Sequence, residues 1–386
     1  MSSERTRPKL VDPEPGRSAP AGRGRVRDRF LGCLLGGAVG DALGAPIEFD
    51  DLAAIRRKYG PDGLTDFAPV HGGLGRITDD TQMTLFTAEG LLRGWVRGSF
   101  RGITSYPGST ARAYLRWLRT QGESPRREIE SESLESGWLF QQRELHSRRA
   151  PGQTCLTALR ATRSPGEPAR NDSKGCGGVM RVAPAGLFAW RLDEAPQRTF
   201  RLGADLAALT HGHPTGALTG GVLACLIQSL IDGTPLSGAL DVARSCLRAE
   251  SDHEETLRAI DRAEASAASA ASRDEAIRRL GQGWVAEEAL AISIYCALVA
   301  RTFEEAVVLA VNHDGDSDST GAITGNLVGA MHGVGAIPER WLAPLELRGV
   351  IAEIAGDLHD FREWDIGESS ADEETNDRIW RKYPGD

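Results

Sequence analysis

Two acidic segments far apart in the chain combine carboxylates with hydroxyl side chains: ITDDT at 77–81 and NHDGDSDST at 312–320. If the fold joins these segments, four aspartates, Thr78 and Ser319 converge on one spot. Neighbouring carboxylates repel one another and raise each other's pKa, so such a group requires a counter-charge. Oxygen-rich sites without thiolate or imidazole ligands select hard divalent cations such as Mg2+ or Mn2+. The pair of segments therefore predicts metal-assisted chemistry.

Each segment also has a simpler interpretation when it is taken alone. Thr78, Asp79 and Asp80 open a strong helical pattern, and such residues commonly cap the free N–H groups of a helix start. The second segment begins like a calcium-binding EF-hand loop, with three alternating aspartates. The calcium interpretation fails because the sixth loop position holds Ser319 instead of glycine and the twelfth holds Gly325 instead of glutamate.

Two further carboxylates lie near the end of the first predicted helix. Asp41 lies within that helix, where a buried carboxylate is costly unless it has a partner. It therefore either orients a metal ligand or a loop, or faces solvent. Pro46 ends the helical pattern and leaves Glu48 in a loop, from which it could activate or position water beside a metal cluster. Considered in isolation, Glu48 is more simply interpreted as a solvated surface residue.

A third segment, NDSKGCGGVMRVAP at 171–184, is rich in glycine. Gly175, Gly177 and Gly178 would expose backbone N–H groups of the kind that bind phosphate oxygens. Lys174 or Arg181 could add positive charge. The order of residues is not that of a Walker A loop.

Other catalytic patterns are absent or weak. His211 and His213 are too closely spaced for a helical i,i+4 metal pair, so one could contact a ligand while the other is a structural or surface residue. There is no G-x-S-x-G elbow, Rossmann fingerprint or H-E-x-x-H motif, which excludes the commonest hydrolase and dehydrogenase types.

The elements that must position these residues are predicted to be helices. Apolar residues recur at helical spacing, alternating strand patterns are scarce, and the predicted fold is an all-α, compact single-domain multi-helix bundle. We predict helices over 26–44, 79–96, 109–120, 131–146, 154–161, 198–210, 215–231, 236–249, 254–271, 285–300, 303–312, 319–333 and 347–358.

Glycines recur every fourth residue in three of these helices. The runs are Gly32, Gly36, Gly40 and Gly44, then Gly212, Gly216 and Gly220, then Gly321, Gly325, Gly329 and Gly333. Spacing of four places each run on one stripe of a helix. Glycine costs about 1 kcal/mol per helical position relative to alanine, so the stripes need a compensating reason. We predict close helix packing that includes the helices with the acidic motifs.

Composition and the chain ends limit the possible partners. The net charge of −9 argues against non-specific nucleic-acid binding and against an anionic membrane surface. Six scattered cysteines and the lack of a signal-peptide pattern indicate a cytoplasmic protein, and 214–231 is better interpreted as a buried helix than as a membrane span. We predict a disordered tail at 1–24, a domain at 25–366, and an acidic tail at 367–386 whose end could dock on the body.

In order along the chain, five segments resemble those of the ADP-ribosylglycohydrolase family. They are GCLLGGAVGDALGAPIEF (32–49), ITDDTQMTLFTAEGLL (77–92), NDSKGCGGVMRVAPAGL (171–187), LTHGHPTGALTGG (209–221) and NHDGDSDSTGAITGNLVGA (312–330). The resemblance covers about 26–365 and implies an all-α bundle with a dinuclear Mg2+ or Mn2+ centre in a cleft.

The resemblance also implies roles for single residues. The implied metal ligands are Thr78, Asp79, Asp80, Asp316, Asp318 and Ser319, with Asp80 and Asp316 also in the catalytic set. Glu48 corresponds to the family's glutamate at the site, while Gly175, Gly177, Gly178 and His211 fall where relatives contact ADP-ribose. Asp314 stands where relatives often have glycine, and we do not expect it to be a ligand.

The resemblance implies a hydrolase that releases ADP-ribose from an ADP-ribosylated protein or a small ADP-ribose conjugate, and we expect it to be a monomer. Its leaving group would depart from the anomeric carbon through an oxocarbenium-like transition state. Two alternatives stay open. One is a two-metal phosphoesterase acting on a nucleotide-like substrate, and the other is a non-catalytic ADP-ribose-binding relative.

Overall fold

The computed structural model describes residues 23–129 and 132–385, and they contain helices and loops but no strand. The α-helices are α1 (Arg23–Gly44), α2 (Leu52–Tyr59), α3 (Asp79–Arg101), α4 (Tyr106–Thr120), α5 (Gln153–Ala161), α6 (Ala183–Arg191), α7 (Pro196–Ala208), α8 (Pro214–Ile231), α9 (Leu236–Arg248), α10 (Glu254–Ala267), α11 (Arg273–Leu280), α12 (Ala286–Val299), α13 (Phe303–Val311), α14 (Ser317–His332), α15 (Glu339–Leu342), α16 (Arg348–Asp360) and α17 (Glu373–Lys382). Short 3-10 helices are η1 (Ala45–Ile47), η2 (Glu132–Glu135), η3 (Leu139–Gln141), η4 (Arg143–His146), η5 (Cys176–Gly178), η6 (Val334–Ala336) and η7 (Phe361–Glu363). The all-α prediction is confirmed. The predicted disordered tail lies outside the described residues, except that 23–24 already belong to α1.

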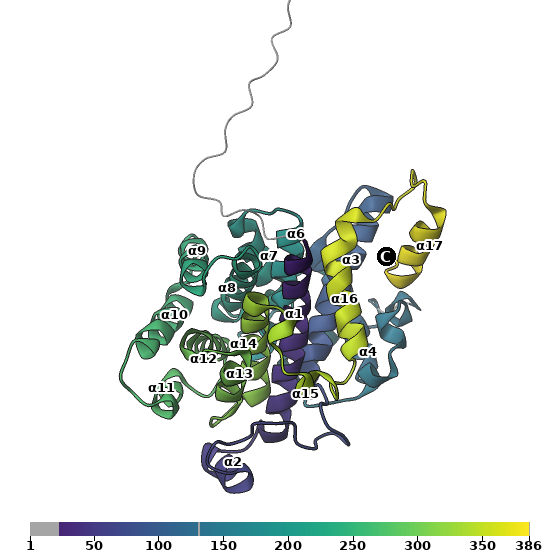
Figure 1. Cartoon of the computed structure of the whole chain (residues 1–386). Coiled ribbons are helices and arrows are strands. Elements are labelled where there is room, and N and C mark those ends of the chain that lie inside the picture. Colours follow the sequence, from purple (N-terminus) through teal and green to yellow (C-terminus); the bar gives the residue numbers. More distant parts are fainter. Residues whose placement is uncertain (1–22, 130–131, 386) are drawn as a thin grey trace, which may run out of the picture.

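The first and last glycine stripes face each other in the centre of the molecule. Helix α1 runs through the middle of the bundle against α14, although the two helices are almost 300 residues apart in sequence (Figure 1). A Cβ atom added at Gly36 would lie 2.5 Å from the carbonyl oxygen of Gly325, and one added at Gly325 would overlap the carbonyl of Gly36. This backbone-to-backbone contact confirms the predicted close packing and joins the helices that carry Asp41 and Asp318.

The remaining glycine stripe acts in a different helix pair. Helix α8 packs against α7, where a Cβ atom added at Gly203 would lie 2.5 Å from the carbonyl oxygen of Gly220. Gly212, the first residue of this stripe, precedes α8 and lies in the turn before it. This stripe therefore allows α7 and α8 to pack closely, whereas the other two stripes pack α1 against α14.

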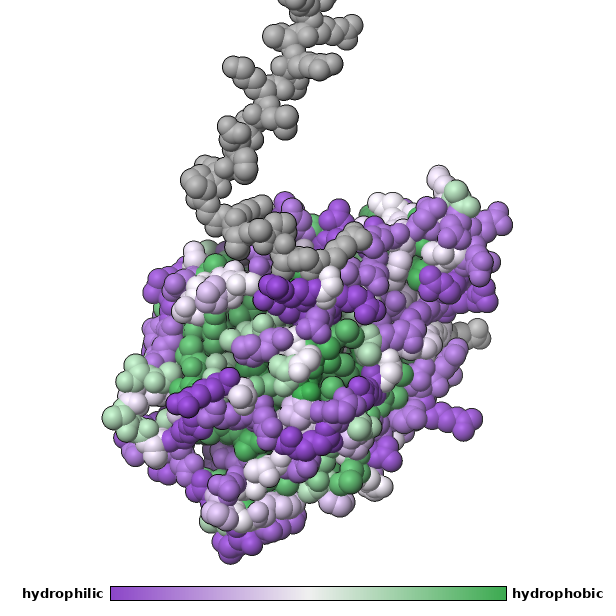
Figure 2. Space-filling view, viewed as in Figure 1, coloured by the Kyte–Doolittle hydropathy of each residue, from purple (hydrophilic) through white to green (hydrophobic). Residues whose placement is uncertain are grey.

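Two described helices are long and apolar enough to cross a membrane, but the fold buries most of each. The apolar windows in Gly24–Ile47 and Pro214–Ile231 are 89% and 83% buried. In Figure 2, green atoms gather over the middle of the visible face, and polar residues surround them. Both segments are core helices of the bundle.

The predicted helix over 131–146 is wrong. The described part of that range forms the three short 3-10 helices η2, η3 and η4. Gly137 interrupts the segment with a positive φ of 96°, and an added Cβ atom there would lie 3.1 Å from a carboxylate oxygen of Glu89. Glu89 and Arg93 form a buried ion pair directly beneath, so the chain must pass over them without side-chain bulk.

The C-terminal segment folds onto the body. Helix α17 buries Ile379 completely, and the buried Tyr383 donates its hydroxyl to Asp357 at 2.5 Å. Lys382 pairs with the same carboxylate at 2.5 Å. Periodicity did not indicate α17 or the short helices α2, α6, α11 and α15.

Candidate metal centre and active site

The first acidic segment is held in place by Asp41, which is fully buried in α1. The Asp41 carboxylate accepts hydrogen bonds from the backbone N–H groups of Thr78 at 3.0 Å and Thr81 at 3.1 Å. It also accepts the Thr78 hydroxyl at 2.8 Å and the Thr81 hydroxyl at 2.5 Å. Asp41 therefore fixes the start of α3, which is the orienting role that the sequence left open.

At the same helix start, Thr78 is the N-cap of α3, and its hydroxyl accepts the N–H of Asp80 at 3.3 Å. The simpler interpretation of this segment as a helix cap is therefore also correct for Thr78. Asp79 and Asp80 follow in the first turn and are buried. One Asp79 oxygen accepts the N–H of Gly152 at 3.2 Å.

The second acidic segment forms the N-terminus of α14. Asp316 is the N-cap of this helix. The N–H of Asp316 donates to the carbonyl of Gln282 at 2.8 Å, and its carboxylate accepts the N–H of Ser319 at 3.3 Å. An aspartate at this position can both cap the helix and direct its second oxygen outward.

The fold brings the two segments together with the loop that follows α1. Oxygen atoms of Glu48, Asp316 and Asp318 lie within 4.8 Å of one another, and all three residues are buried. Asp79 and Asp80 lie close enough for their charges to act on Asp316, and Ser319 contacts Asp80. The six predicted ligands and Glu48 thus share one buried region that is rich in carboxylates.

Burial and mutual repulsion make these carboxylates hard to ionise. Burial, followed by the charges of Asp316 and Asp79, raises the pKa of Glu48 to about 8. Burial is also the main cause that raises the pKa of Asp79 to about 8. The pKa values of Asp80 and Asp318 are raised well above the usual range, first by burial and then by neighbouring carboxylates.

This donor set fits hard divalent cations. In residues 23–129 and 132–385, no Lys, Arg or His forms an ion pair with Glu48, Asp79, Asp80, Asp316 or Asp318. One oxygen of Asp80 is buried without a hydrogen-bond partner among these residues. Buried carboxylates in this state are stabilised when a cation replaces the missing counter-charge.

Asp314 lies apart from this cluster. One of its oxygens accepts the N–H of Leu52 at 2.6 Å, and Asp314 is not among the three residues whose oxygens lie within 4.8 Å of one another. The expectation that Asp314 is not a ligand agrees with this contact.

The glycine loop 175–178 packs over a buried histidine. Added Cβ atoms at Gly175, Gly177 and Gly178 would lie 3.2 to 3.4 Å from ring atoms of His211. His211 is 1% exposed, and its Nδ1 atom hydrogen-bonds with Thr210 at 2.8 Å. Burial lowers the pKa of His211 to about 3, so the ring is neutral. The imidazole lies directly under the loop, and His213 caps α8 instead.

Neither cation of this segment is available as a free charge. Lys174 pairs with Glu255 at 2.7 Å and with Glu287. Arg181 is fully buried, donates to the Thr210 hydroxyl at 2.6 Å, and stacks on the ring of Tyr114. Both side chains already have partners within the protein, and the expectation that Lys174 or Arg181 adds charge for a phosphate group stays a prediction.

Sequence reasoning missed four residues that contact or flank the cluster. The Cys176 thiol donates to a carboxylate oxygen of Asp316 at 2.7 Å, and Met180 contacts the Ser319 hydroxyl at 3.7 Å. Phe49 is 76% exposed and stacks on Trp284 with ring centroids 5.7 Å apart. The only available signal was adjacency, because Phe49 follows Glu48 and Cys176 lies within the glycine loop.

Comparison with known proteins agrees with this architecture. The model of a family described as ADP-ribosylglycohydrolase matches residues 23–366. The ADP-ribosyl-[dinitrogen reductase] glycohydrolase of Rhodospirillum rubrum is 26% identical over 328 residues, 84% of this chain and 92% of that protein. ADP-ribosylarginine hydrolase Tri1 of Serratia proteamaculans is 26% identical over 344 residues, 86% of this chain and 79% of that protein.

A solved structure of an ADP-ribosylglycohydrolase-related protein complex superimposes with a TM-score of 0.64 and 29% identity. The alignment covers 87% of this chain and 98% of that one. The family match spans most of the chain and includes both acidic segments and the glycine loop. The chain belongs to the ADP-ribosylglycohydrolase family.

Proposed function

We propose that this protein is a metal-dependent hydrolase that cleaves the N- or O-glycosidic bond between ADP-ribose and an acceptor. The observation that carries the proposal is the meeting of Glu48 with the two acidic segments in one buried cluster. Family membership supports hydrolysis of an ADP-ribose linkage. The substrate would be an ADP-ribosylated protein or a small ADP-ribose conjugate.

Thr78, Asp79, Asp80, Asp316, Asp318 and Ser319 would hold two Mg2+ or Mn2+ ions. When bound, such ions neutralise the carboxylates and act as Lewis acids toward water and ribose hydroxyls. Asp41 keeps Thr78 and the start of α3 in place, and the α1–α14 contact keeps the two ligand segments at a constant separation.

Glu48 would act on the attacking water. Its carboxyl group is buried beside Asp316 and Asp318. Once bound cations neutralised these neighbours, Glu48 would ionise and could accept a proton from a water molecule aimed at the anomeric carbon. As the bond to the acceptor breaks, positive charge develops on the ribose ring. Asp80 and Asp316 would stabilise that charge. The hydroxyl of the water would join the anomeric carbon, and the proton taken up by Glu48 would pass to the departing acceptor, so the products are ADP-ribose and the free acceptor.

The glycine loop would take the diphosphate. The N–H of Gly175 faces Ser173 and that of Cys176 donates to the carbonyl of Trp284, so Gly177 and Gly178 are the amides we assign to phosphate oxygens. His211 would support the loop from beneath as a neutral ring.

The stacked pair Phe49 and Trp284 would lie on the acceptor side. Both rings are exposed. Phe49 directly follows Glu48 in the sequence, and Trp284 directly follows Gly283, which packs on Asp316. An exposed aromatic face next to carboxylates favours a planar cation such as a guanidinium group. An arginine-linked acceptor fits this rim better than a serine-linked one.

A product assay tests the proposal. The protein is incubated with Mn2+ or Mg2+ and with arginine-linked ADP-ribose, serine-linked ADP-ribose or a dinucleotide phosphate. Release of free ADP-ribose that stops on chelation supports the proposal. Release of AMP would identify a phosphoesterase, and binding of the conjugates without turnover would identify a non-catalytic ADP-ribose-binding protein.

A further inference from the structure

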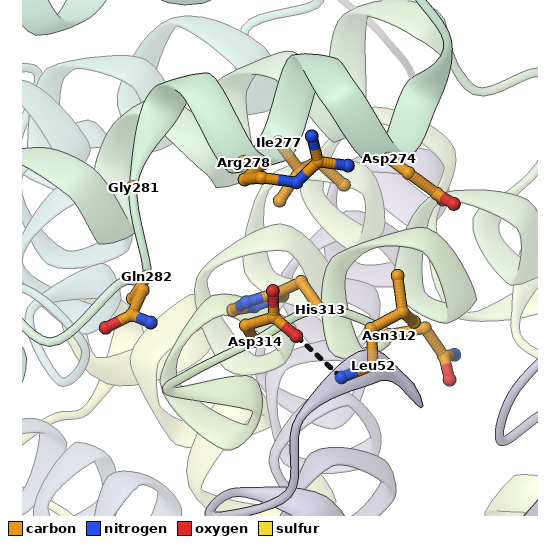
Figure 3. A pocket seen from close by; sticks show the side chains of 9 residues that line it. All are labelled: Leu52, Asp274, Ile277, Arg278, Gly281, Gln282, Asn312, His313 and Asp314. Atoms are coloured by element: carbon orange, nitrogen blue, oxygen red, sulfur yellow. Dashed lines mark hydrogen bonds between the residues drawn. The ribbon is translucent and has the colours of Figure 1, made fainter. Parts of the chain in front are cut away.

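The loop that precedes α14 attaches to the chain segment that follows Glu48. Asp314 accepts the N–H of Leu52, the first residue of α2, at 2.6 Å (Figure 3). Asn312 accepts the N–H of Leu64 at 2.7 Å and donates to the carbonyl of the same residue at 2.9 Å. The loop before α14 thus binds both ends of the segment 52–64.

The segment that carries Glu48 is also attached to α14 at its other end. A Cβ atom added at Gly44 would lie 2.5 Å from the backbone nitrogen of Asp318, so the end of α1 touches the start of α14. Between Gly44 and Leu52, the N–H of Asp50 donates to the carbonyl of Ile47 at 3.0 Å and closes a tight turn. Glu48 therefore lies on a short bridge whose two ends are both fixed to the ligand loop.

A cavity lies beside the Asp314 contact. A hollow of about 180 Å3 lies between α11 and the loop, and Leu52, Asp314, His313, Gln282 and Arg278 help to line it. Figure 3 shows Arg278 and Ile277 on one side of this hollow, with Asp314 and Leu52 across it. Helix α11 reaches α2 through the partly exposed ion pair of Arg56 and Asp274, at 2.7 Å, whereas Asp314 binds the backbone at the very start of α2. The Asp314 contact is thus the one that joins the start of α2 to the ligand loop.

We propose that Asp314 is a positioning residue for Glu48. Its hydrogen bond to Leu52 holds the bridge 48–52 against the loop that carries Asp316 and Asp318, and so sets where the Glu48 carboxylate lies. The catalytic part of this inference rests on the proposed hydrolase function. The hydrogen bond itself and its mechanical effect do not.

The test compares Asp314→Ala with Asp314→Asn, which keeps an acceptor oxygen but removes the charge. For Asp314→Ala we expect kcat to fall about tenfold with KM within about twofold, since orientation of the reacting group is lost. Asp314→Asn should keep at least half of the activity. Mn2+ affinity, measured by titration without substrate, should change by less than about threefold in both variants, because Asp314 is not a ligand.

A double-variant comparison separates positioning from an independent effect. If Asp314 acts through Glu48, then Glu48→Gln with Asp314→Ala is no slower than Glu48→Gln alone. Asp66→Ala is the matched control. It removes an exposed side-chain hydrogen bond to the N–H of Phe67 (2.8 Å) outside the bridge, and should leave kcat within about twofold.

Hydrogen exchange provides a readout that does not need turnover. Asp314→Ala should speed amide exchange in the peptide that contains Leu52, and Asp314→Asn should restore protection. Unchanged exchange in Asp314→Ala, an equal loss of kcat in both Asp314 variants, or additive effects with Glu48→Gln would each overturn the proposal. If the wild-type protein releases no ADP-ribose from any conjugate, the proposed function fails, and the exchange result alone decides the Asp314 contact.

Discussion

Replacement of Asp79 by asparagine should stabilise the metal-free protein. The carboxyl group of Asp79 is buried, and its pKa is raised from 3.8 to about 8. A group whose folded pKa is raised binds its proton more tightly in the folded state. The folded protein therefore loses stability relative to the unfolded chain as pH rises from about 4 to about 8. Asparagine keeps an oxygen for the N–H of Gly152 and carries no charge.

The size of the effect follows from the two pKa values. At pH 7 the unfolded carboxyl is ionised, and keeping it protonated in the fold costs about 1.36 kcal/mol per pH unit above 3.8. The penalty is on the order of 4 kcal/mol at pH 7 and about 0.5 kcal/mol at pH 4. Asp79→Asn should therefore gain stability over wild type at pH 7 and gain almost none at pH 4.

The assay is equilibrium urea denaturation in the presence of a chelator at pH 4, 5.5 and 7. Asp377→Asn, at an exposed position, is the control and should change stability by less than about 0.5 kcal/mol at every pH. Adding Mn2+ at about 100 times its Kd should stabilise wild type by about 2.7 kcal/mol per site and the variant by less. Equal stability of both proteins at pH 7, or a difference that does not grow with pH, would refute the reasoning.

Three further predictions concern the centre and its support. Asp318→Ala should abolish Mn2+ binding and turnover, and activity that survives this change after dialysis against chelator would remove the metal role. Glu48→Gln should lower kcat by about 100-fold with an unchanged unfolding midpoint, because it removes a proton acceptor and little packing; a wild-type rate would exclude Glu48 from the reaction. Gly36→Ala should destabilise the protein by about 2 kcal/mol because its Cβ meets the Gly325 carbonyl, whereas Gly349→Ala, with open space around it, should be neutral or stabilising by up to about 1 kcal/mol. Urea denaturation of both variants checks the last prediction, and equal effects would contradict it.

Helix existence was largely predictable because long helices impose a strong apolar period. Helices α3, α8 and α12 lie close to their predicted ranges. The failure at 131–146 has a physical cause, since a buried Glu89–Arg93 pair beneath the segment requires the turn at Gly137. No local sequence pattern predicts a contact between a segment and a buried ion pair on another helix.

The sequence also predicted only part of the candidate site. Residue type predicted which side chains could hold hard cations, and glycine spacing predicted that their helices pack closely. Sequence did not indicate that Asp41 would take four hydrogen bonds at the start of α3, or that Cys176 and Trp284 would border the cluster. These contacts join segments that lie 37 to 140 residues apart.

By itself, the sequence determined the helical class, the acidic and hydroxyl residues that we propose as ligands, and the small residues that permit close helix contact. Each of these depends on residue type and local period. Only the tertiary structure decided which glycine stripes pack against each other. It also engaged Lys174 and Arg181 with other partners and turned Asp314 away from the cluster toward Leu52. The reason is that partner choice depends on distances across the fold, and a hydrogen bond or ion pair forms only where the assembled backbone brings both groups within about 3 Å.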